Sequence, residues 1–218
     1  MTQLFEEPGT TKELLKPRDT AGRRLHDILH RMPALSPLIV LILAGVIFGL
    51  ENGRFFTPQN LSILLQQVAW GGSLAVGQTL VILTAGIDLS IGAVMVLSSL
   101  VMAKLVADNG IPGPVALIIG LAVAVLAGAL NGLLVTRIKL PPFIVTLGTL
   151  SIFTAGTLIY AQGQTISLSP NTFMTWTGST ISIGNFHLTV GVLMMLLLYV
   201  IFAYVLRQTA WGRHVYAT

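Results

Sequence analysis

Residues 61–106 read LSILLQQVAWGGSLAVGQTLVILTAGIDLSIGAVMVLSSLVMAKLV. This stretch is almost uncharged, and it is too long for one membrane-spanning helix, which needs about 20 apolar residues. Residues 84–88, Thr-Ala-Gly-Ile-Asp, interrupt it, because Gly86 can end one helix and Asp88 can begin the next. The pattern predicts two helices, 61–83 and 89–106, joined tightly. A re-entrant element is the alternative, because non-helical backbone is tolerated in a membrane where protein buries it.

The composition of the 218-residue chain also points to a membrane protein. Hydrophobic residues make up 54% and charged residues only 9% of it, whereas soluble domains carry about 25% charged residues. Its mean hydropathy is +0.83. These values exclude an ordinary soluble enzyme, a disordered chain and a nucleic-acid binder, despite the net charge of +4. The absence of cysteine excludes disulfides, cysteine-ligated metal sites and a catalytic thiol.

Working outward from residues 61–106, we predict an all-α, polytopic integral membrane protein with about six transmembrane helices. The predicted spans are residues 34–50, 61–83, 89–106, 112–135, 143–161 and 188–206. Small residues recur every four positions in span four, and Gly45 and Gly49 repeat this spacing in span one. Such stripes allow another helix to approach closely. The stripe of span four consists of Ala116, Gly120, Ala124, Gly128 and Gly132.

Lysine and arginine residues gather on one side of this six-span chain. Only Arg54 and Lys104 fall on the opposite side, so the N-terminus is predicted to be cytoplasmic by the positive-inside rule. Residues 207–218 then begin a cytoplasmic loop. The other ten basic residues are Lys12, Lys16, Arg18, Arg23, Arg24, Arg31, Arg137, Lys139, Arg207 and Arg213.

The N-terminal tail, residues 1–33, is predicted to be disordered up to residue 19. Leu25, Ile28, Leu29 and Met32 follow at helical spacing opposite charged residues, which predicts a short helix lying on the inner leaflet. No small-residue cleavage site follows the first apolar segment clearly, so we do not expect a cleavable signal peptide.

Asp88 is the one acidic residue within a hydrophobic stretch, and two interpretations of it stay open. An ionisable group within a membrane is expensive and marks a functional site by default. Alternatively, Asp88 caps the following helix, where its charge meets the positive end of the helix dipole. Both can hold, because transporters build sites where helices are broken.

Further polar residues within the predicted spans are candidates for a translocation path. Gln67 and Gln78 share one face of span two, and Thr146, Thr149 and Phe153 belong to span five. Hydrogen bonding between helices explains these groups equally well. The complete candidate set is Gln67, Gln78, Asp88, Ser90, Asn131, Thr146, Thr149 and Phe153.

The predicted outer loop, residues 162–187, carries no charge and mixes Ser, Thr, Asn and Gln with large apolar residues. A loop this long is either functional, as a lid or docking surface, or a poorly ordered linker. Elsewhere the chain has no P-loop for ATP, no histidine pair at a credible metal site and no nucleophile–base pair. We therefore expect neither catalysis nor a cofactor in this chain.

Five stretches, in this order, form a pattern of motifs. They are FFTPQNL at 55–61, QTLVILTAGIDLSIG at 78–92, NGL at 131–133, PPFIVTLGT at 141–149 and TAWGRHVYA at 209–217. Over residues 35–218 this pattern resembles the permease subunits of bacterial ABC sugar importers in the ribose, xylose and fructose branch. The fructose-type members are the most similar.

This resemblance implies a multi-pass protein of the bacterial inner membrane that carries a pentose or hexose and has no chemistry of its own. Its implied partners are a second permease copy, membrane lipid, a periplasmic sugar-binding protein and a cytoplasmic ATPase that holds ATP and Mg²⁺. Members of the family continue past the position of Thr218 into a coupling segment and a second half. We therefore expect this sequence to be truncated. A non-coupling fragment and a membrane-embedded enzyme on lipid substrates are the rival hypotheses.

Overall fold

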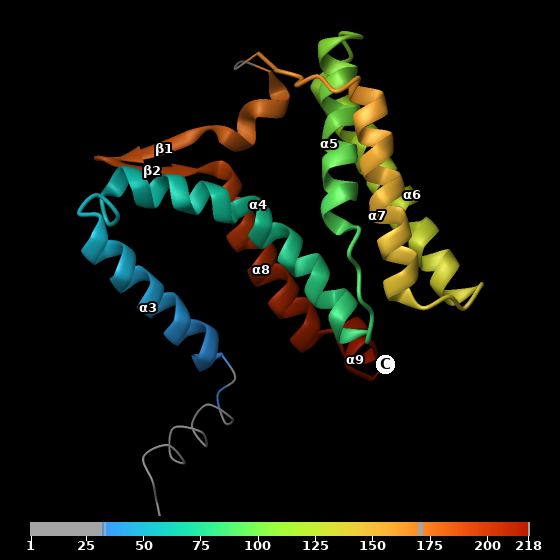
Figure 1. Ribbon diagram of the computed structural model, residues 1–218, viewed down its shortest axis with the longest axis horizontal. Coiled ribbons are helices and arrows are strands. Elements are labelled where there is room, and N and C mark those ends of the chain that lie inside the picture. Colours follow the sequence, from blue (N-terminus) through green and yellow to red (C-terminus); the bar gives the residue numbers. More distant parts are fainter. Residues whose placement is uncertain (1–31, 33, 170–171, 218) are drawn as a thin grey trace, which may run out of the picture. The chain divides into compact units, whose positions relative to one another are not determined.

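The computed structural model describes residues 32, 34–169 and 172–217, and this part of the chain is mostly helical (Figure 1). The chain divides into two compact units, Met1–Phe56 and Thr57–Thr218. The predicted disordered stretch and surface helix of the tail lie outside the described residues, except for Met32. The elements in chain order are α3 (Leu35–Glu51), α4 (Pro58–Leu83), α5 (Ile91–Ala107), α6 (Gly113–Thr136), α7 (Pro142–Ala161), η1 (Phe173–Gly178), β1 (Thr180–Ile183), β2 (Phe186–Thr189), α8 (Val190–Gln208) and α9 (Ala210–Ala217).

In the first unit, helix α3 is followed by an aromatic cluster. The rings of Phe48 and Phe55 stack with centroids 5.7 Å apart, and Phe55 meets Phe56 edge-on at 5.0 Å. The ring of Phe56 lies against Gly49 so closely that a Cβ there would overlap it. At Gly49 the close approach is thus made, within this unit, by an aromatic side chain and not by another helix, whereas a Cβ on Gly45 would stand 3.9 Å from the same ring, at ordinary contact distance.

Helix α4 opens the second unit with a clear start signal. Thr57 adopts extended backbone geometry, and its hydroxyl accepts the backbone N–H of Asn60 at 3.4 Å. Pro58 follows in the first helical position, where its missing N–H removes no helical hydrogen bond. The helix therefore begins three residues before the predicted residue 61.

The end of α4 forms a Schellman motif, in which backbone donors fold back onto the last turn. The N–H of Gly86 donates to the carbonyl of Val81 at 2.9 Å, and that of Ala85 donates to Ile82 at 3.0 Å. Ala85 occupies the left-handed region at φ 55°. A Cβ on Gly86 would stand 2.9 Å from Cγ1 of Val81. The helix thus ends beside Gly86, as predicted, but the left-handed residue of the motif is Ala85 and not the glycine.

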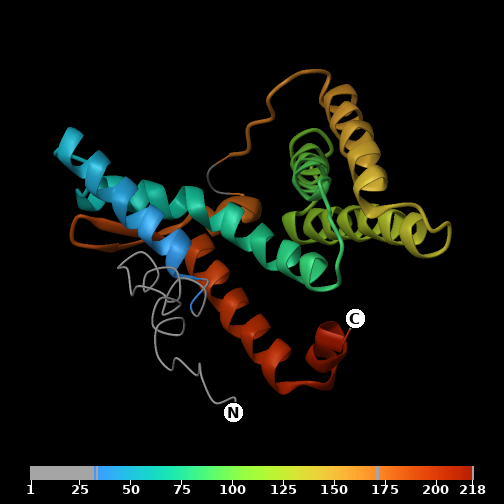
Figure 2. The same ribbon diagram turned by 60° about the horizontal axis from the view of Figure 1, so that its bottom comes forward.

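Helices α5, α6 and α7 pack against one another and form one group in Figures 1 and 2. Gly120 of α6 packs against the Met102 side chain of α5, where a Cβ would overlap it. This contact confirms close packing along the first half of the small-residue stripe. At Gly128 and Gly132, a Cβ would meet nothing within 4 Å.

Helix α8 packs along α4, and the pair is also visible in Figure 1. Gly72 lies in the middle of α4, and the side chain of Met195 fills the space where its Cβ would be. Met195 and Val192 are buried at this contact side of α8. A single glycine therefore lets the two helices approach.

The segment predicted as a loop, residues 162–187, contains regular structure. Strands β1 and β2 pair in an antiparallel hairpin, with a register from Thr180 opposite Thr189 to Ile183 opposite Phe186. The hairpin packs on α4, where the N–H of His187 donates to the buried hydroxyl of Ser62 at 2.8 Å. The all-α expectation is therefore wrong for this short segment.

Helices occupy all six predicted span ranges, with ends that differ from the prediction by at most three residues. By length and composition, α6, α7 and α8 are able to cross a membrane. Helices α3 and α5 are apolar but have only 17 residues each. Residues 84–90, between α4 and α5, are not helical, and the helical conformation resumes at Ile91.

The Schellman motif predicts opposite effects for two neighbouring substitutions. Gly86→Ala places a methyl group against Val81 and is expected to destabilise the fold by about 1–3 kcal/mol. Ala85→Gly relieves the left-handed backbone and is expected to be neutral or mildly stabilising. Thermal unfolding in detergent, followed by circular dichroism, measures both. An unchanged midpoint for Gly86→Ala would contradict the close approach.

Candidate functional site

Asp88, Ser90 and Asn131 form a chain of hydrogen bonds between the α4–α5 junction and helix α6. Oδ1 of Asp88 accepts both the backbone N–H and the hydroxyl of Ser90, each at 2.7 Å. Nδ2 of Asn131 then donates to the Ser90 hydroxyl oxygen at 2.7 Å. Ser90 is fully buried and Asn131 is 6% exposed. These hydrogen bonds therefore hold the start of α5 against α6, at a position that is largely shielded from solvent.

The junction is also held by helix α7. The hydroxyl of Thr146 lies 3.1 Å from the carbonyl oxygen of Ile87 and 2.9 Å from that of Pro142, one turn earlier in its own helix. Thr146 is buried. A non-helical carbonyl within an apolar segment thus finds a donor on a neighbouring helix, as a membrane environment requires.

The expectation that Asp88 itself caps α5 is wrong. Ser90, two residues further on, is the N-cap residue of α5, and its own side chain makes no capping hydrogen bond to the helix. Asp88 instead accepts the N–H of the cap residue itself. The carboxylate therefore stabilises the turn that leads into α5, from a partly buried position.

Two buried side-chain oxygens lack a hydrogen-bond partner among the described residues. They are Oδ1 of Asn131 and Oε1 of Gln78. Buried polar atoms are normally hydrogen-bonded, so each is a place where a water or a ligand atom would be stabilised. Both atoms belong to residues that were predicted to line the translocation path.

Half of the candidate path residues meet at the junction, and the other half take no part in its hydrogen-bond chain. Thr149 is buried, and its hydroxyl donates within α7 to Val145 at 3.1 Å. Gln67 is exposed and Phe153 is partly buried, and neither takes part in the hydrogen-bond chain at the junction. The residues that meet at the junction are Asp88, Ser90, Asn131 and Thr146.

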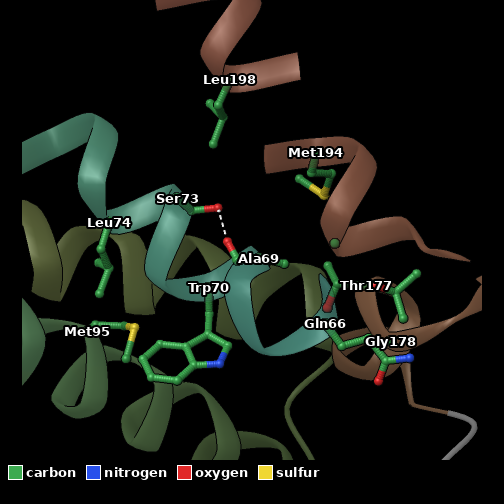
Figure 3. Close-up of a pocket in the computed structure, with 12 residues that line it drawn as sticks. Gln66, Ala69, Trp70, Ser73, Leu74, Met95, Thr177, Gly178, Met194 and Leu198 are labelled. Carbon is green, nitrogen blue, oxygen red and sulfur yellow. Dashed lines mark hydrogen bonds between the residues drawn. The ribbon is translucent and has the colours of Figure 1, made fainter. Parts of the chain in front are cut away.

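An open cavity of about 470 Å³ lies elsewhere in the second unit, where residues of α4, α5, η1, β2 and α8 meet (Figure 3). None of the eight candidate path residues lines it. Its polar and aromatic lining includes Gln66, Trp70 and Ser73 of α4. These three positions follow helical spacing and therefore lie on one face of α4. The sequence-based prediction named Gln67, whereas its neighbour Gln66 lines the cavity. The Trp-Gly-Gly sequence at 70–72 was the feature of the sequence that could have indicated this face of α4.

The hydrogen-bond chain makes Ser90 a positioning residue with a measurable contribution. Ser90→Ala removes the link between Asp88 and Asn131 and leaves a buried amide without its partner, which costs about 1–3 kcal/mol. Ser99→Ala is the matched control, because Ser99 is exposed and its hydroxyl bonds only within α5 to Met95. Thermal unfolding in detergent should separate the two variants. Equal unfolding midpoints of the two variants would show that the hydrogen bonds of Ser90 contribute nothing to the stability of the fold.

Comparison with known proteins shows extensive similarity to import permeases. The chain is 47% identical over 203 residues to the fructose import permease protein of Rhizobium meliloti, which covers 91% of this chain and 56% of the relative. It is 38% identical over 187 residues to the ribose import permease protein of Bacillus subtilis, covering 85% and 57%. It is 33% identical over 180 residues to the autoinducer 2 import system permease protein of an Enterobacter species, covering 83% and 51%.

The chain thus spans about half the length of the curated relatives that it matches. No solved structure matches it. A family model described as the permease component of the branched-chain amino acid transport system matches residues 60–218. The chain therefore belongs to this family of ABC import permeases, in the branch that contains the ribose and fructose import permeases.

Proposed function

We propose that this chain forms part of the translocation path of an ATP-driven importer for a monosaccharide, a pentose or a hexose, in the bacterial inner membrane. The observation that carries the proposal is its similarity to fructose and ribose import permeases over 91% and 85% of its length. Transport by a permease needs a shaped passage and no catalytic group. ATP and Mg²⁺ belong to a separate ATPase subunit in this proposal.

In the proposed topology, the six helices α3–α8 each cross the membrane, and the N-terminus is cytoplasmic. Five of them have 17 to 24 residues, within the roughly 17–25 that a bilayer requires, and α4, with 26, would cross it with a tilt. With that orientation, Arg137 at the end of α6 and Arg207 at the end of α8 both face the cytoplasm, in accordance with the positive-inside rule.

Large apolar side chains on the helix surfaces support lipid and a second copy of the chain as partners. Leu41, Val125 and Ile159 are 68%, 68% and 77% exposed. Apolar patches of this kind mark membrane or protein contacts. A cytoplasmic ATPase and a periplasmic sugar-binding protein complete the proposed assembly, the latter docking on the hairpin segment 162–187.

Within this proposal, the path residues remain those predicted from the sequence, with Asp88 and Ser90 at the junction as the best supported. A membrane-embedded enzyme would need several acids, bases or metal ligands at one depth. The carboxylate of Asp88 is engaged by Ser90, and the nearby polar partners Asn131 and Thr146 are an amide and a hydroxyl. These groups suit positioning better than acid–base chemistry.

Sugar uptake tests the proposal directly. Deleting the chain from its host should abolish accumulation of radiolabelled D-fructose or D-ribose, because no path remains, while uptake of L-leucine should be unchanged. Reintroducing the chain with its ATPase and binding protein should restore the sugar uptake. Unchanged uptake of both sugars in the deletion strain would reject the function.

Substitution of Asp88 separates the two interpretations of its carboxylate. Asp88→Asn keeps an oxygen that can accept from Ser90, so the variant should insert, fold and transport within about threefold of the original chain. Asp88→Leu removes the acceptor and should cost about 1–3 kcal/mol of stability. Fluorescence-detected size exclusion and uptake measure these effects. A stable Asp88→Asn variant without uptake would instead assign the charge to transport.

A further inference from the structure

The cavity beside Trp70 combines an aromatic surface with several neutral hydrogen-bonding groups. Its volume of about 470 Å³ falls within the roughly 300–1,000 Å³ of small-molecule sites. Five elements contribute to it, because α4, α5, η1, β2 and α8 all place residues along its wall. None of these residues takes part in the hydrogen-bond chain at Asp88.

Trp70 provides the aromatic surface. Its side chain is 60% exposed, although it belongs to the helix that packs on α8. Figure 3 shows the indole near Met95, with its nitrogen on the side where Gln66 and Thr177 lie. A large apolar ring with one N–H donor suits a ligand that has both an apolar face and hydroxyl groups.

The polar groups of the cavity can serve both as donors and as acceptors. Gln66 offers an amide with two donors and one acceptor oxygen, and Thr177 offers a hydroxyl. Thr189, buried at the end of β2, offers a second hydroxyl. Ser73 donates to the carbonyl of Ala69 at 2.8 Å, as Figure 3 shows, so its oxygen is left to accept.

None of the described residues that line the cavity is charged, and this restricts the class of ligand. An ionised amino or carboxyl group placed against this lining would meet no opposite charge among the described residues. Neutral hydroxyl groups, by contrast, are matched by amides and hydroxyls. The lining therefore favours a neutral polyhydroxylated ligand over an amino acid or a phosphorylated sugar.

We propose that the cavity lined by Gln66, Trp70, Ser73, Thr177 and Thr189 is a subsite for a neutral monosaccharide, with Trp70 stacking on the C–H face of the sugar ring. The assignment rests on the proposed import function and specifies where this chain contacts its substrate. A transit site has to release the sugar again, so we expect weak binding, with a Kd of about 1–10 mM.

Tryptophan fluorescence tests the subsite without transport. The full chain contains three tryptophans, so Trp176→Phe with Trp211→Phe leaves Trp70 as the reporter. Titration with D-fructose and with D-ribose, in lipid nanodiscs, should give a saturable change for at least one of the sugars. Gln66→Leu should weaken that response about tenfold, whereas Gln59→Leu, an exposed position earlier in α4, should not.

Uptake by the assembled transporter provides the second measurement. Trp70→Ala should lower sugar uptake about tenfold, and Trp70→Phe, which keeps an aromatic ring, only about two- to threefold. Normal uptake by Trp70→Ala, or no saturable response of Trp70 to either sugar, would overturn the subsite. A response to L-leucine stronger than that to the sugars would overturn the ligand class.

These outcomes are distinguishable from failure of the proposed function. If deletion of the chain abolishes sugar uptake while the Trp70 variants transport normally, the import function stands and the subsite is wrong. If sugar uptake does not depend on the chain at all, the function itself is rejected.

Discussion

The need to satisfy backbone polar groups inside an apolar protein is the constraint on which the second unit depends. Where the chain leaves α4 and before it enters α5, no helix satisfies its N–H and C=O groups, and a membrane offers no water to do so. The last turn of α4 accepts from Ala85 and Gly86, Asp88 accepts from Ser90, and Thr146 donates to Ile87. The non-helical segment is therefore built around a set of specific acceptors and donors.

These hydrogen bonds also determine how the surrounding helices are arranged. Because Asn131 reaches Ser90 from α6 and Thr146 reaches Ile87 from α7, the junction ties α5 to both helices. Apolar contacts then complete the packing, with Gly120 admitting Met102. Polar contacts at one end and a close small-residue contact further along fix the helices by two independent means. Neither would define a unique arrangement alone, since apolar surfaces slide against each other more readily than hydrogen-bonded groups.

Much of this architecture could be predicted because long apolar segments have few alternatives in a membrane. The six helices and the break at Gly86 followed from that constraint. The partners of Ser90 and Thr146 could not be predicted, since they lie 41 and 59 residues away and depend on helix rotation. The hairpin could have been predicted from the alternating Thr-Ile-Ser-Ile at 180–183 and the following Gly184-Asn185, a common two-residue turn. The cavity could not be predicted, because its position depends on where η1 and α8 pack against α4, and hydropathy does not reveal that packing.

The contrast between junction and cavity has a consequence for selectivity. The junction holds the carboxylate of Asp88 close to Ser90, whereas the described residues that line the cavity beside Trp70 are all uncharged. A family described by the transport of branched-chain amino acids also contains relatives named for fructose and ribose import. Helix packing can stay the same between such proteins while a few lining residues differ. Adding one charged side chain to a neutral lining would favour a ligand of opposite charge over a neutral sugar. Selectivity in such a fold would therefore depend on which of these residues carry charge, and less on the backbone.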